Sequence, residues 1–148
     1  VSGGGIDFLR VWAEEAYGIP PYQVVGSSIK ATYEEVEGKP QILKIPELNF
    51  IDDKAGKPEG IHQHIGKKPV IAVGNSDGDF EMLEYTTQEP GARLGILIHH
   101  TDGEREFAYD SLSPIGNLKR GLLEGPSRGW VLVNMAEDWA KIYPEYHE

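Results

Sequence analysis

Polar side chains that could form a binding site follow a short apolar run, Val70–Val73, in the segment GNSDGDFEML of residues 74–83. The β-branched run, the glycine, the polar turn and the apolar residues at helical spacing predict a strand, a tight turn and a helix. Ligands of open α/β sheets bind beyond the carboxyl ends of the strands, so we expect Asn75, Asp77 and Asp79 to lie at such a site. Their oxygen atoms could hold a hard cation or accept hydrogen bonds from backbone N–H groups.

The same residues also have a purely structural interpretation. Ser76 and Asp79 have the spacing of a capping box that would hold the start of the helix, and Asp77 could stabilise that end through the helix dipole. Capping and a role in a site are compatible. A calcium loop of the EF-hand type is excluded, because its glycine and its final glutamate do not fall correctly whether the loop starts at Asn75 or at Asp77.

A second polar group lies at the beginning of the chain. Ser2 precedes three glycines and then a segment with helical spacing, and a hydroxyl beside the N–H groups of a helix N-terminus is a good anion site. The alternative is an ordinary glycine-rich loop in which Ser2 caps the helix. Lys57 stands just ahead of Pro58 and another predicted helix, although a lone lysine is most often a solvated surface charge.

GNSDGDFEML resembles the fourth motif of the haloacid dehalogenase superfamily, in its phosphoserine-phosphatase-like branch. In that motif an acidic residue follows the strand glycine and a second acid lies a helical turn further on. Asn75 and Asp79 occupy these positions, so the resemblance implies that they hold or orient Mg²⁺ and that Asp79 takes part in catalysis. Asn75 departs from the pattern, and a neutral amide binds a hard divalent cation more weakly than a carboxylate does.

VSGGGIDF is similar to the second motif of the superfamily, a strand ending in Ser or Thr whose hydroxyl binds the transferring phosphoryl group. This implies a catalytic, substrate-binding role for Ser2, with the amides of Gly3 and Gly4 nearby. AGKPEGI resembles the third motif, in which a lysine neutralises the nucleophile carboxylate and a phosphoryl oxygen. Lys57 matches that lysine, and Lys54 is the alternative.

These motifs imply a phosphomonoester hydrolase that uses Mg²⁺ and acts on a small phosphorylated substrate. The family also needs an aspartate nucleophile in a DxD motif on a central strand, and no such strand occurs here, since the segment 77–79 belongs to the fourth motif and Asp52-Asp53 follows no apolar run. We therefore expect residues 1–148 to be the C-terminal part of one domain, inactive alone. The N-terminal part of the same protein, or another copy of the chain, would cover the open strand edges.

The order of the predicted elements indicates an α/β fold. Strands alternate with helices, which favours a parallel sheet with helices on its faces, and the resemblance makes this a three-layer, Rossmann-like core with a projecting β-hairpin and a missing central strand. Besides the strand at residues 70–73 and the helix after it, we predict strands at residues 23–29, 93–99 and 130–133, a hairpin at 31–36 and 41–45, an irregular connection at 46–55, and helices or helical fragments at 6–17, 58–65, 104–109, 115–123 and 135–142.

Composition excludes several classes of protein. Twenty-four acidic residues outnumber fourteen basic ones, giving a formal net charge of −10 that argues against a nucleic-acid partner. The absence of cysteine excludes disulfides and thiol nucleophiles. No apolar run is long enough to span a membrane, so we expect no membrane association, and a cytoplasmic and a periplasmic location are both compatible with the resemblance.

Two further interpretations stay open. Asn75 in place of an acid is compatible with a binding or interaction domain that keeps the fold without hydrolysis, and the superfamily also includes dehalogenases. His100 and Asp102, after the strand predicted at residues 93–99, are candidates to line the site. His62 and His64 are spaced so that a helix would not bring them side by side.

Overall fold

The structure is a computed structural model of an α/β chain with one mixed and one parallel sheet, and it describes residues 1–143. The chain divides into two compact units, Val1–Lys67 and Lys68–Glu148. Within the described residues, no helix is long and apolar enough to cross a membrane.

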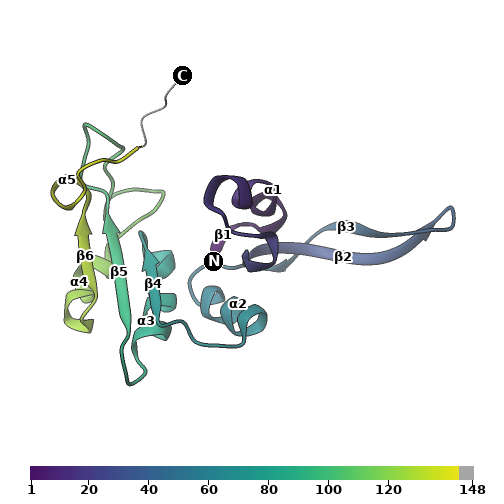
Figure 1. The fold of residues 1–148 in the computed structure, drawn as a ribbon, viewed down its shortest axis with the longest axis horizontal. Coiled ribbons are helices and arrows are strands. Elements are labelled where there is room, and N and C mark those ends of the chain that lie inside the picture. Colours follow the sequence, from purple (N-terminus) through teal and green to yellow (C-terminus); the bar gives the residue numbers. More distant parts are fainter. Residues whose placement is uncertain (144–148) are drawn as a thin grey trace. The chain divides into compact units, whose positions relative to one another are not determined.

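The first unit contains a three-stranded sheet in the order β1-β2-β3, with β1 and β2 parallel and β2 and β3 antiparallel (Figure 1). Its elements are β1 (Ser2–Gly5), α1 (Ile6–Tyr17), a 3₁₀ turn (Pro21–Gln23), β2 (Gly26–Val36), β3 (Lys39–Phe50) and α2 (Gly56–Ile65).

Helix α1 has the bounds that its apolar spacing predicts. Its inner face buries Ile6 and Ala13 against Val24, and Leu9 packs beside them. The helix ends at Gly18, which adopts the left-handed conformation with φ of 67°. Its N–H donates hydrogen bonds to carbonyls of the last turn. Glycine suits this position because it has no Cβ to clash in that conformation.

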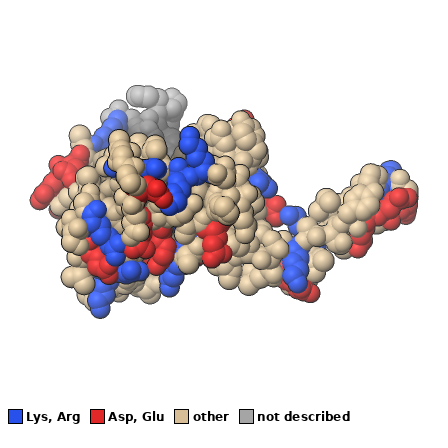
Figure 2. All heavy atoms as spheres, turned by 90° about the horizontal axis from the view of Figure 1, so that it is seen from below, with Lys and Arg blue, Asp and Glu red and all other residues tan. Residues whose placement is uncertain are grey.

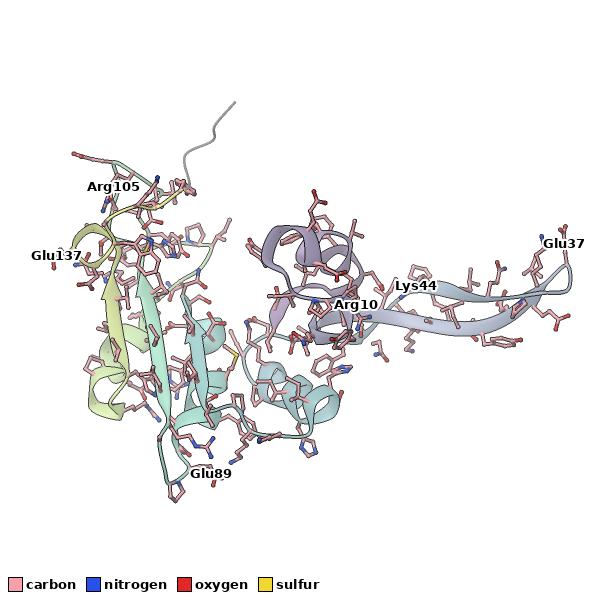
Figure 3. The ribbon with its side chains drawn as sticks, viewed as in Figure 1. Arg10, Glu37, Lys44, Glu89, Arg105 and Glu137 are labelled. Atoms are coloured by element: carbon pink, nitrogen blue, oxygen red, sulfur yellow. The ribbon has the colours of Figure 1, made fainter. Side chains whose placement is uncertain are left out.

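The hairpin is longer than predicted. The expected separate strand and hairpin are one continuous strand, β2, and β3 runs on to Phe50 through the region predicted to be irregular. The prediction was wrong there because Pro46 suggested a break, whereas an edge strand tolerates proline. Lys44 of β3 forms an ion pair of 2.7 Å with Asp7 of α1. Glu37 lies at the acidic tip of the β2–β3 hairpin (Figures 2 and 3).

The second unit contains a fully parallel sheet in the order β4-β5-β6. Its elements are β4 (Ile71–Gly74), a 3₁₀ turn (Asp77–Asp79), α3 (Phe80–Thr87), β5 (Leu94–His99), α4 (Arg120–Glu124), a second 3₁₀ turn (Pro126–Arg128), β6 (Val131–Asn134) and α5 (Met135–Asp138). The parallel strand–helix alternation confirms the α/β class.

One face of the parallel sheet is covered and holds the core of this unit. Phe80 and Trp130 meet edge to face there with ring centroids 4.9 Å apart, and Leu97 is fully buried. On β4, alternate side chains point to the opposite face, where Ile71 and Val73 are 57% and 50% exposed. Apolar residues of this kind are usually covered in a parallel sheet.

Both β1 and β4 pair on one side. Among the described residues, β1 pairs with β2 and β4 pairs with β5, and no further strand is assigned to either of them. An additional strand beside β1 and β4 therefore stays a prediction.

Three predicted helices are shorter or missing. The segment predicted as a helix at residues 104–109 forms turns, because the Asp102 carboxylate accepts the N–H groups of Glu104 and Arg105 and replaces helical hydrogen bonds. Gly116, with φ of 66°, prevents a helix from starting at residue 115, so only α4 forms there. Helix α5 ends at Asp138 instead of residue 142, and Pro144, which we expected after it, lies outside the described residues.

Candidate functional site

The turn after β4 is built as its sequence predicts. Ser76 caps the helix start, its hydroxyl accepts the N–H of Gly78 at 3.2 Å, and Asp79 completes the capping box. Oδ2 of Asp79 accepts the N–H groups of Asn75 and Ser76 at 2.9 and 3.1 Å. Gly74 makes this approach possible, because a Cβ at that position would overlap the Asp79 side chain.

Asn75 is exposed and belongs to a chain of side-chain contacts that the sequence does not reveal. Its Nδ2 donates to the Tyr109 hydroxyl at 2.5 Å, and the Tyr109 ring stacks on His100 with centroids 4.6 Å apart. His100 in turn pairs through Nδ1 with Glu106 at 2.7 Å. The pKa of the Tyr109 hydroxyl is raised overall, mainly by burial and also by the charges of Glu106 and Asp79. The hydrogen bond from Asn75 acts in the opposite direction.

Asp77 has a structural role beyond the one expected. It lies in the first turn after Ser76, as predicted, but its carboxylate reaches the start of α4. Oδ2 accepts the N–H groups of Lys119 and Arg120 at 3.0 and 2.9 Å, and Oδ1 accepts that of Gly121 at 2.8 Å. These bonds commit Asp77 to holding a distant segment.

In the first unit, the residues singled out from the second and third motifs gather around Asp52. This carboxyl group is fully buried, and its Oδ2 accepts the N–H of Ser2 at 3.1 Å. Lys57, only 7% exposed, acts on it electrostatically. Burial raises the pKa of Asp52, while the Ser2 N–H and the Lys57 charge act in the opposite direction.

Asp52 was missed by the sequence reasoning, which considered it only as part of a nucleophile motif. Its Oδ1 is buried and has no hydrogen-bond partner among the described residues. A carboxyl group in this state carries a desolvation cost, and this cost is the largest cause of the raised pKa of Asp52. The only signal in the sequence is its position five residues before Lys57, and nothing in the local pattern predicts its burial.

The N–H of Gly4 donates to the Ser2 hydroxyl at 3.2 Å, and Gly3 is exposed. Ser2 is the first residue of β1 and does not cap α1, whose N-cap is Gly5. The alternative of a capping serine was therefore wrong.

Another candidate, Asp102, pairs with the guanidinium of Arg105. Hydrogen bonds from the backbone and the side chain of Arg105 lower the pKa of Asp102. The guanidinium of Arg105, labelled in Figure 3, also donates to four backbone carbonyls, including those of Met135 and Trp139. Lys54, the alternative to Lys57, is exposed.

In the first unit, Ser2 and Lys57 thus share Asp52 as a partner, and in the second unit Asn75 and Asp79 are in direct contact. Within residues 1–143, no group of three or more His, Cys, Asp or Glu side chains is arranged to hold a metal ion. Mg²⁺ is commonly held by one or two carboxylates together with water and substrate oxygens, so Asn75 and Asp79 fit part of such a site.

No family model matches the chain, and no curated protein matches it. The functional assignment therefore depends on the motifs and on the geometry of the residues above.

Proposed function

We propose that this chain is part of a phosphomonoester hydrolase of the haloacid dehalogenase superfamily, similar to the phosphoserine-phosphatase branch. In this proposal each of its two sheets is an incomplete part of a haloacid dehalogenase-like core, and the open sides of β1 and β4 are available to strands outside this chain. Supporting this fold, β1 and β4 each pair on one side among the described residues, and the β4 side chains Ile71 and Val73 are exposed.

The observation that carries the proposal is that Ser2 and Lys57, distant in sequence, both act on the buried Asp52. The backbone N–H of Ser2 donates to its carboxyl group, and the charge of Lys57 acts on it electrostatically. The Ser2 hydroxyl and the Lys57 ammonium are suited to hold phosphoryl oxygens, since charge-assisted hydrogen bonds to an anion are strong. Burial of Lys57 strengthens its effect, because a partly desolvated charge is screened less by water.

Asn75 and Asp79 are the residues that would hold or orient Mg²⁺, which when bound would neutralise charge on the phosphoryl group. Asp79 is already fixed by two backbone N–H groups, so it is preorganised. Asn75 would contribute its amide oxygen, since its Nδ2 is directed to Tyr109. The aspartate nucleophile is assigned to a segment outside this chain.

Phosphate binding tests the proposal without requiring turnover. We expect inorganic phosphate to bind the 148-residue chain, with binding followed by ³¹P NMR, and to bind at least tenfold more weakly in the Ser2→Ala and Lys57→Met variants, since a hydrogen bond to a charged group contributes about 1.5–3 kcal/mol. Lys54→Met, at the exposed neighbouring lysine, is the control. If folded Lys57→Met binds phosphate as the wild type does, the assignment of Lys57 is wrong.

Activity gives a second test. The chain alone should show no turnover of a phosphomonoester with Mg²⁺, because it lacks the nucleophile. Turnover that is lost on substitution of Asp79 would contradict that division of roles.

A binding domain of the same fold is the second candidate, favoured by one observation. The Asn75 amide is already hydrogen-bonded to Tyr109. Calorimetric titration with Mg²⁺ separates the two candidates, and Asn75→Asp should strengthen Mg²⁺ binding if the site is catalytic in origin.

A further inference from the structure

A cavity of about 450 Å³ lies in the second unit beside the end of β4. The side chains of Phe107, Pro114 and Ile115 form its walls, and Asn75 and Tyr109 supply polar groups. Apolar walls with a few placed polar groups are typical of small-molecule sites, and this volume is large enough for one aromatic ring or a branched aliphatic group.

The polar part of the cavity is held in place by its neighbours. The Tyr109 ring stacks on His100 and lies next to Gly116, where a Cβ would come within 2.7 Å of the tyrosine ring. The carboxylate of Glu106, whose side chain is only 6% exposed, pairs with Nδ1 of His100 and holds that ring in place. The Tyr109 hydroxyl is therefore preorganised, which reduces the entropy lost when a ligand binds.

The lining of the cavity favours an uncharged group. The side chains of Phe107, Pro114 and Ile115 offer no partner to a charge. Burying an unpaired charge among apolar side chains is costly. An uncharged group with a hydrogen-bonding oxygen fits both the walls and the Tyr109 hydroxyl.

The walls lack cover in this unit. Phe107 and Ile115 are 79% and 83% exposed, although both are large and apolar. Apolar side chains that gather at the mouth of a cavity are typical of a surface that a ligand covers.

We propose that this cavity binds the uncharged aromatic or branched aliphatic alcohol part of the phosphomonoester, and so selects such substrates over phosphoserine. The inference rests on the proposed function, because it takes Asn75 to lie beside both the metal and the leaving alcohol. Phosphoserine is disfavoured because its leaving group carries a carboxylate and an ammonium group, which the apolar walls would desolvate without pairing.

Binding of phenol to the 148-residue chain tests the cavity directly. We expect phenol and phenyl phosphate to shift the backbone NMR signals of Tyr109 and Ile115, and O-phosphoserine and inorganic phosphate to leave these signals unchanged. Ile115→Glu should weaken phenol binding at least tenfold, because it replaces an apolar wall by a charge. Leu112→Glu is the matched control, since Leu112 is 93% exposed on the same segment and does not line the cavity.

Three results would overturn the proposal: no shift of Tyr109 or Ile115 with phenol, equal losses in the two glutamate variants, or shifts of these residues that depend on protein concentration without any probe. The last result would assign the walls to a second copy of the chain. If phenol binds but inorganic phosphate does not bind at Ser2 and Lys57, the phosphatase assignment fails while the cavity remains a ligand site. If phosphate binds there and phenol does not, the cavity proposal fails alone.

Discussion

Replacing Asp77 by alanine should destabilise the second unit by about 2–3 kcal/mol. The Asp77 carboxylate accepts hydrogen bonds from three consecutive backbone N–H groups at the start of α4. The backbone N–H of Asp77 donates to the Asn117 carbonyl at 2.7 Å. Lys119, the N-cap residue of α4, makes no side-chain cap of its own. The carboxylate of Asp77 therefore supplies the cap that this helix start lacks.

The magnitude follows from the number and exposure of these bonds. Loss of an N-cap acceptor costs about 0.5–2 kcal/mol, and a hydrogen bond to a charged group contributes about 1.5–3 kcal/mol. The sum for three bonds overestimates the effect, because water can reach N–H groups at the surface once the carboxylate is removed. Arg120 also keeps its 3.0 Å ion pairs with Glu81 and Glu124, which continue to hold α4.

Urea unfolding measures the effect. With a slope of about 1–3 kcal/mol per molar urea, the midpoint of unfolding should fall by about 1 M in Asp77→Ala. Asp77→Asn keeps one oxygen acceptor but presents an NH₂ group to the remaining N–H groups, so we expect about half of the loss. Glu137→Ala, at an exposed residue of the same unit (Figure 3), should change stability by less than about 0.5 kcal/mol.

The reasoning would be refuted if Asp77→Ala were as stable as the Glu137→Ala control. A stable Asp77→Ala variant that had lost Mg²⁺ binding would instead make Asp77 a metal ligand. The capping box at Ser76 and Asp79 should stay intact in either case, because its hydrogen bonds do not involve the Asp77 side chain.

Three other predictions concern the buried Asp52, the packing at Gly95 and the hydrogen bonds of Arg105. Burial raises the pKa of Asp52 above 3.8, so the folded state holds the carboxyl proton more tightly than the unfolded state does. The stability of the wild type relative to Asp52→Asn should therefore fall as pH rises from about 4 through the folded pKa, and then level off. Urea unfolding at each pH measures this difference. Gly95→Ala should cost about 1–3 kcal/mol in thermal unfolding, because its Cβ would lie 2.8 Å from Trp130 Cδ1; an unchanged melting temperature would show that the indole moves freely. Arg105→Ala should speed amide hydrogen exchange in α5, because the guanidinium links the Asp102 turn to carbonyls of that helix; equal exchange in wild type and variant would contradict this.

Much of the secondary structure was predictable, because it depends on interactions between neighbours in the sequence. The bounds of α1 follow from its apolar spacing and from Gly18, and the turn after β4 follows from the Ser76 and Asp79 spacing. The parallel pairing of β4 and β5 was also expected. The errors fell where a local pattern was ambiguous, as in the segment after His100, where Asp102 forms a turn in place of a helix.

The candidate site was only partly predictable. Ser2, Lys57, Asn75 and Asp79 were recognised from short motifs, whose residues are adjacent in sequence and carry their own chemistry. The partners of these residues could not be recognised in this way. Asp52 is one of them, and its burial becomes visible only when β1 and α2 pack around it.

What the sequence by itself determined is therefore the α/β alternation, the capped turn at residues 74–79 and the types of the polar residues that a phosphate or metal site would use. Only the tertiary structure decided which distant groups those residues meet: Tyr109 for Asn75, and the start of α4 for Asp77. The physical reason is that helix periods and caps depend on residues a few positions apart, whereas burial and long-range hydrogen bonds depend on how separate elements pack.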